Sequence, residues 1–174
     1  MIKDYEYLHG VVFSRLCSVQ GECITIEPYP ISGYNSSYIV NNHTGLYIKY
    51  SGKRLTPWRF TFLKSQQDEI QSLYNEFGEV FIALVCNLDG VAVLNYAELK
   101  EILDHQHGDF EWISVSKTKR KMYSVSGSDG KLDFKVSLTS CPDKIITYLK
   151  QPEQKSKCAP SASAFLMAVA SPSE

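Results

Sequence analysis

The sequence contains a continuous apolar segment, Val80 to Cys86 (VFIALVC), which constrains the fold more than any other feature. It is far shorter than the roughly 20 apolar residues that a membrane-spanning helix needs, and no other stretch of the chain approaches that length. A strand that is apolar on both sides has to be covered on both faces. The segment therefore predicts the central strand of a sheet with helices or further strands above and below it.

The flanking segments show two kinds of pattern. Helical spacing of apolar residues, or a capping pair, predicts helices over residues 3–18, 65–77, 95–103 and 140–149. The capping pairs are Ser65 with Asp68, Asn95 with Glu98, and Ser140 with Asp143. β-branched and aromatic residues predict strands over residues 23–27, 37–41, 45–50, 58–62, 91–94, 112–116, 122–125 and 132–136. The expected fold class is α/β (α+β): a central mixed β-sheet flanked by helices, with a β-rich C-terminal extension.

The length of 174 residues suits one domain with its own core. We expect a single α/β domain over residues 1–150 and a flexible or partner-docked tail over 151–174, which is rich in Ser, Ala, Pro and Lys. The five cysteines include no C-x-x-C pair, which favours neither a disulfide framework nor a zinc site. Because the N-terminus also lacks the pattern of an export signal, we predict a cytoplasmic protein without membrane contact.

Acidic residues are distributed unevenly along the chain. No Asp or Glu occurs from Pro28 to Gln67, whereas the whole chain has 19. The stretch holds the cations Lys49, Lys53, Arg54, Arg59 and Lys64, and the aromatic residues Tyr29, Tyr34, Tyr38, Tyr47, Tyr50, Trp58, Phe60 and Phe62. If neighbouring strands gather them on one sheet face, that face suits a phosphate backbone and unstacked bases. The alternative interpretation places the rings in the core and the cations on an ordinary rim.

A second basic run, Lys117-Thr118-Lys119-Arg120-Lys121, links two expected strands. It can hold phosphates at a hairpin tip, or it can be a solvated loop that protects a sheet edge from aggregation. A net charge of only −1 argues against a surface that is basic throughout, so any interface with DNA or RNA is local. The predicted nucleic-acid-binding residues are Lys49, Lys53, Arg54, Arg59, Lys64, Lys119, Arg120 and Lys121.

From Lys3 to Leu94 the order of helix, strand, hairpin, helix and strand resembles the core of the PD-(D/E)XK nuclease superfamily, a restriction-endonuclease-like core. The resemblance implies an Asp from the second core strand, and an acidic residue two positions before a Lys on the third, which together hold Mg²⁺ and activate a water. Lys49 matches that lysine, whereas Asn41 or Asn42 stands for the Asp and Tyr47 for the acid. Glu6 on the first helix is the remaining family-like acid. Lys49 and Glu6 are therefore the candidate catalytic residues, and the replacement of the implied acids indicates an impaired metal site.

Alternate histidines, His105 and His107, lie between Asp104 and Asp109. They can chelate a metal from a loop, but no further Cys or His at a recognisable spacing accompanies them. We interpret the segment as ordinary polar surface and predict no metal ligands.

Three functions are consistent with these patterns. The first is a nucleic-acid-binding module with a nuclease-like core, an impaired metal site and no cofactor, which is not an enzyme. The second is an active Mg²⁺-dependent nuclease with carboxylates from other positions, such as Glu22, Glu27 or Asp68. The third is an interaction or assembly module without nucleic-acid binding, in which Trp58, Phe60 and Phe62 form the self-associating face of a homodimer.

Overall fold

The computed structural model describes residues 1–29, 35–106 and 108–151. Its main sheet has five strands in the order β1-β2-β3-β5-β6. Their bounds are Ile26–Pro28, Ser37–Val40, Thr44–Ser51, Val80–Cys86 and Val91–Leu94. β3 and β5 run parallel, and the other neighbours are antiparallel. Every residue of β5 is buried, which confirms the central strand predicted from its apolar sequence.

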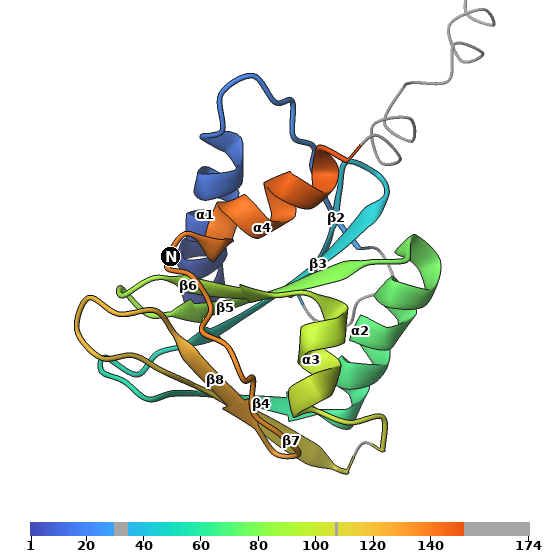
Figure 1. Ribbon diagram of the computed structural model, residues 1–174. Helices are drawn as coiled ribbons and strands as arrows, with labels where there is room; N and C mark the ends of the chain where they lie inside the picture. The colour runs from blue at the N-terminus through green and yellow to red at the C-terminus, as the bar shows by residue number, and fades with distance from the viewer. Residues whose placement is uncertain (30–34, 107, 152–174) are drawn as a thin grey trace, which may run out of the picture.

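A second sheet of three strands lies beneath the first, in the order β4-β7-β8. It comprises Trp58–Leu63, Phe110–Ser116 and Ser124–Gly127 (Figure 1). The α+β class and the mixed central sheet are as predicted, but the C-terminal strands are not a separate extension, because β4 from the middle of the chain pairs with β7. Both sides of β3 are already occupied by β2 and β5, so β4 has to bury its apolar side elsewhere.

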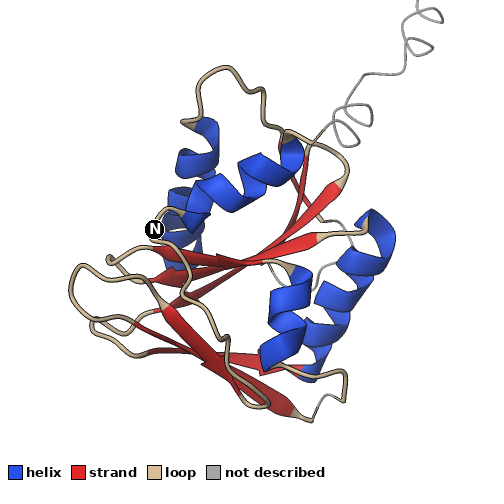
Figure 2. Ribbon diagram, in the orientation of Figure 1, coloured by secondary structure: helices blue, strands red, loops and turns tan. Residues whose placement is uncertain are grey.

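Helices cover both faces of the five-stranded sheet (Figures 1 and 2). α1 (Asp4–Cys17) and α4 (Ser140–Leu149) pack on one face, together with Leu46 and Ile48 of β3. α2 (Lys64–Phe77), α3 (Tyr96–Ile102) and the inner face of the three-stranded sheet pack on the other, where Tyr47 lies. Successive residues of β3 thus point into different cores, as the two-residue period of a strand requires. No helix within the described residues has the length and apolar character to cross a membrane.

The predicted helix caps are right for α3 and wrong for α2. Asn95 Oδ1 accepts the Glu98 N–H at 2.9 Å, and a Glu98 carboxylate oxygen accepts the Asn95 N–H at 3.0 Å, which is the predicted capping box. α2 begins one residue before Ser65, and Gln66 Oε1 accepts the Leu63 N–H at 3.2 Å. Ser65 is therefore inside the helix rather than at its cap.

The C-terminal third departs from its predicted pattern in two respects. Ser140 does not cap α4 with its side chain, because its hydroxyl accepts the buried Val93 N–H at 3.1 Å. Residues 132–136 do not form a regular strand; two isolated antiparallel bridges, Lys131 opposite Ser126 and Val136 opposite Tyr123, hold this segment beside β8. The predicted tail over 151–174 lies outside the described residues except for Gln151.

Candidate nucleic-acid interface

The two basic runs of the sequence meet at one end of the three-stranded sheet. β4 and β7 pair antiparallel with Trp58 opposite Val115, so the loop before β4 (52–57) lies beside the loop after β7 (117–123). The Lys117 N–H donates to Thr56 Oγ1 at 3.1 Å and joins the two loops. Between them is an open depression of about 270 Å³, lined in part by Arg54, Lys119 and Arg120.

The carboxylate lining this depression is already engaged. Asp89 lies 2.6 Å from Lys117 Nζ and accepts a hydrogen bond from the Tyr123 hydroxyl at 3.1 Å. An adjoining depression of about 280 Å³ is lined by Lys121 and Lys135, among others. Four cations at this end form no ion pair with a carboxylate of the described residues, and we call them the basic rim: Arg54, Lys119, Arg120 and Lys121. Positive charge therefore accumulates here even though the whole chain is nearly neutral.

The solvent side of the same sheet, which we call the outer face, carries a stacked cation and ring. The residues of β4 alternate between buried and exposed, and Arg59 is among the exposed ones. Its guanidinium carbon lies 4.4 Å from the centroid of the half-buried Trp112 ring on β7. Phe110, two residues earlier on β7, projects to the same side and is 67% exposed.

The outward side chains of the three-stranded sheet include no acid. The outward residues of the three strands are Arg59, Thr61, Leu63, Phe110, Trp112, Ser114, Ser116, Ser124 and Ser126. At the β8 edge, Lys131 lies opposite Ser126, and the Lys135 amine donates to the Ser124 hydroxyl. Asp133, between these two lysines, is an exposed acid at this edge. Cations therefore border the outer face at its edge as well as at the rim.

The structure does not place all the predicted binding residues at this interface. Lys49 projects from β3 toward α2, where its amine donates to Gln66 Oε1 and lies 4.7 Å from the centroid of the Phe62 ring. Phe62 is an inward residue of β4 and Arg59 an outward one, so β4 separates Lys49 from the outer face. Lys53 is exposed in the loop next to the basic rim, whereas Lys64 is exposed at the opposite end of β4.

Most aromatic residues of the acid-free stretch belong to the core. Tyr29, Tyr47, Trp58, Phe60 and Phe62 are each at most 6% exposed, and Tyr34 lies outside the described residues. Trp58, Phe60 and Phe62 cannot form an exposed self-associating face, so that basis for a homodimer is wrong. Tyr50 of this stretch is 38% exposed, and on the three-stranded sheet the accessible rings are Phe110 and Trp112 of β7, which were not predicted. The alternation Trp112-Ile113-Ser114-Val115-Ser116 was the available signal, because it places Trp112 with the serines on the polar side.

The positions that the nuclease resemblance assigns to metal ligands have structural roles. The Tyr47 side chain is fully buried, and Asn41 sits in the β2–β3 turn with φ 49°, where its Oδ1 accepts the Thr25 N–H at 2.9 Å. Glu6 accepts the Lys3 N–H at 2.7 Å at the start of α1. α1 covers the face of β3 opposite to Lys49, so the structure does not bring Glu6 and Lys49 together.

The alternative acids are equally dispersed. Glu22 lies 3.5 Å from Lys150 Nζ in an ion pair, Glu27 is exposed on the edge strand β1, and Asp68 is exposed on α2. They come from different parts of the surface, and no described contact joins any of them to Lys49. They therefore give no support to a metal site around that lysine.

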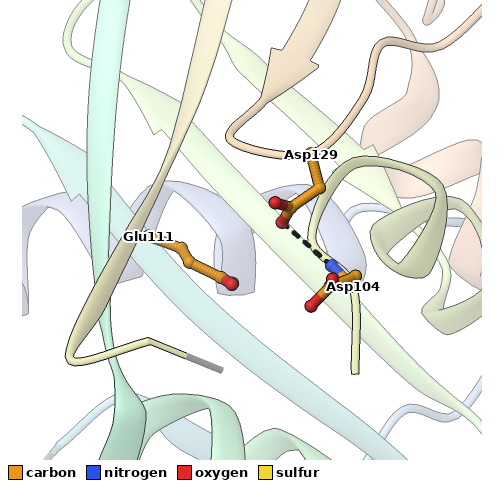
Figure 3. A group of neighbouring side chains, drawn as sticks. All are labelled: Asp104, Glu111 and Asp129. Carbon is orange, nitrogen blue, oxygen red and sulfur yellow. Dashed lines mark hydrogen bonds between the residues drawn. The ribbon is translucent and has the colours of Figure 1, made fainter. Parts of the chain in front are cut away.

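A group of three carboxylates occurs at the end of the three-stranded sheet remote from the basic rim (Figure 3). Oxygens of Asp104, Glu111 and Asp129 all lie within 4.8 Å of one another, and the Asp104 N–H donates to Asp129 Oδ2 at 3.1 Å. His105 is exposed and is not part of the group, and His107 lies outside the described residues. Carboxylates can hold a hard cation. Here the hydrogen bond between Asp104 and Asp129 also joins the loop after α3 to the hairpin that follows β8.

Burial of the Lys49 amine has a consequence for stability. Burial lowers the pKa of Lys49 from 10.5 to about 8, and its described contacts are a neutral amide and a ring rather than a carboxylate. Below pH 8 the charged amine opposes folding, and stability rises with pH between about 8 and 10.5 as the unfolded chain also loses this proton. We expect Lys49→Met to raise the free energy of unfolding by about 1–2 kcal/mol at neutral pH.

Urea unfolding near neutral pH and near pH 10 measures this effect. The gain from Lys49→Met should shrink at the higher pH, where the native amine is neutral. Lys64→Met, at an exposed position, is the matched control and should change stability little. Loss of stability on Lys49→Met at both pH values would contradict the prediction.

Comparisons with known proteins do not assign the chain to a class. No protein-family model matches it, and no curated protein or solved structure matches it significantly.

Proposed function

We propose that the chain is a nucleic-acid-binding module with a nuclease-like core and an impaired metal site, and that its basic rim holds the sugar-phosphate backbone of DNA or RNA. The convergence of two basic loops on one depression carries this proposal. Cations that no carboxylate neutralises release condensed counterions when they contact phosphates, which favours binding at low salt. A loop that only kept an edge soluble would not need a second basic loop beside it.

The nuclease-like core is supported by element order. α1, β1, the β2–β3 hairpin, α2 and β5 follow one another in the order on which the resemblance rests, with β4 inserted before α2. A buried Tyr47 and a turn-forming Asn41 occupy the positions of the implied acids. We therefore propose that the chain binds nucleic acid without cleaving it and without a bound Mg²⁺. Lys49 is the residue that still matches the family pattern.

A salt series tests the proposed binding. Fluorescence anisotropy with a labelled oligonucleotide should show a log–log slope of about −3 for four phosphate contacts, since each contact contributes about −0.7 on a single strand. Arg54→Ser combined with Arg120→Asn should weaken binding and reduce the slope by about 1.4. Asparagine is chosen because Arg120 has φ 60°, a conformation that Asn tolerates.

The control for this series is Lys3→Ser, which removes an exposed cation at the start of α1, on the face of the five-stranded sheet away from the rim and the outer face, and should leave the slope unchanged. A flat salt dependence, or no binding at low ionic strength, would contradict the proposal. Incubation with plasmid and Mg²⁺ or Mn²⁺ tests the impaired site separately. Cleavage that is lost on Lys49→Ala would assign the chain to the active nucleases instead.

A further inference from the structure

Two ring side chains lie side by side on the outer face. Phe110 is 67% exposed and Trp112 is half-buried, and as alternate residues of β7 they project from the same side. The other outward residues of β7 and β8 are serines, whereas on β4 Leu63 lies opposite Phe110 and Arg59 stacks on one side of Trp112. Exposed aromatic rings on a sheet are platforms for nucleic-acid bases, because every base offers a flat π-face.

The rings and the basic rim are arranged in one line. Ser116, at the end of β7, leads into the loop of the rim, and Trp112 and then Phe110 follow in the opposite direction along the strand. The seven residues of β7 span about 20 Å at about 3.4 Å each. Arg59 stacks on Trp112 partway along this path. A backbone held at the rim could thus continue over the sheet with about two or three bases on it.

This arrangement suits unpaired bases. In a duplex the π-faces are occupied by neighbouring base pairs, so rings on a sheet surface would have no base face to stack on. An unpaired base can stack on a ring, and the serine hydroxyls of β7 and β8 can hydrogen-bond to its edges. Resting on the proposed function, we propose that the ligand is single-stranded nucleic acid and that its bases stack on Trp112 and Phe110.

Tryptophan fluorescence provides the test. Trp58 is 2% exposed and lines the depression at the basic rim, whereas Trp112 lies on the outer face, so the part of the quenching that is lost in Trp112→Ser reports stacking on Trp112. We expect an oligothymidylate of about ten nucleotides to quench this emission and to compete better than a duplex of equal length. An abasic oligonucleotide of the same length, which has the phosphates without the bases, should bind without quenching.

Variants at Trp112 separate stacking from charge. Trp112→Ser should weaken single-strand binding about 5- to 100-fold, the range for loss of one stacked base, and leave duplex binding unchanged. Trp112→Phe should retain most of the affinity, and Phe110→Ser should weaken binding in the same direction. Circular dichroism of each variant checks that it is folded. If Trp112→Ser does not fold, Phe110→Ser, at a more exposed position, still tests the stacking.

The outcomes distinguish the two proposals. Equal affinity for single strand, duplex and abasic strand, with Trp112→Ser behaving as wild type, would overturn the stacking inference and leave the proposed function standing. Failure of all three probes to bind at low salt would overturn both. A dimer that Trp112→Ser dissociates, seen by sedimentation without any oligonucleotide quenching, would assign the outer face to a second copy of the chain instead.

Discussion

Replacing Gly127 with alanine is expected to lower the free energy of unfolding by more than about 3 kcal/mol. Gly127 ends β8 against the C-terminal end of α3, and a Cβ atom there would lie 2.2 Å from the Ile102 carbonyl oxygen and 2.9 Å from its carbon. Both are backbone atoms and cannot rotate away. The Asp129 N–H also donates to the Ile102 carbonyl at 3.2 Å, so separating the two segments would break a hydrogen bond as well.

Urea unfolding with a fluorescence or circular dichroism readout measures this loss. Gly10→Ala is the matched control, because a Cβ there meets nothing within 4 Å and alanine favours the interior of α1, which should raise stability by about 1 kcal/mol. Gly130→Ala should act like Gly127→Ala, since its Cβ would lie 2.1 Å from the Glu101 carbonyl oxygen. A Gly127→Ala protein as stable as wild type would contradict the described packing of this hairpin on α3.

Local patterns predicted the elements of the fold better than their pairing. The apolar run of β5 and the apolar spacing in α1 and α2 are properties of neighbouring residues, and these elements form where they were expected. The pairing of β4 with β7 joins Trp58 to Val115 across more than a third of the domain, and no local pattern encodes that choice. β2 and β5 occupy the two edges of β3, so β4 pairs with a strand of the second sheet. That outcome depends on the assembled sheet and not on the residues next to β4 in the sequence.

The same distinction applies to the candidate interface. Arg54, Lys119 and Arg120 were predicted because they stand in basic runs, and the structure brings them to one depression. Lys49 belongs to the same acid-free stretch but projects toward the side of Tyr47 and Phe62, since a strand sends alternate residues to opposite faces. A stretch of sequence with one kind of charge is therefore not yet a surface with that charge. The register of each strand has to be known first.

His9 connects the packing of α1 to the pH of the solution. It is 2% exposed, and its Nδ1 lies 3.0 Å from the Tyr38 hydroxyl, which donates in turn to the Asn35 carbonyl. This chain of bonds assigns the ring proton to Nδ1 and leaves the buried Nε2 without a hydrogen-bond partner among the described residues. The rings of Tyr5, Tyr38 and Tyr50 surround it, from α1, β2 and β3. Burial lowers the pKa of His9 from 6.5 to about 4.

We expect acidification to remove about 3 kcal/mol of stability through this one residue. Above about pH 6.5 His9 is neutral in both states and stability is full; between pH 6.5 and 4 only the unfolded chain takes up the proton, so stability falls as pH falls. Urea unfolding from about pH 7.5 to about pH 4.5 measures the loss, and His9→Leu should remove this part of it. His105→Gln, at an exposed histidine, should keep the wild-type profile. An unchanged profile in His9→Leu would show that protonation of His9 does not oppose the docking of α1 on the sheet.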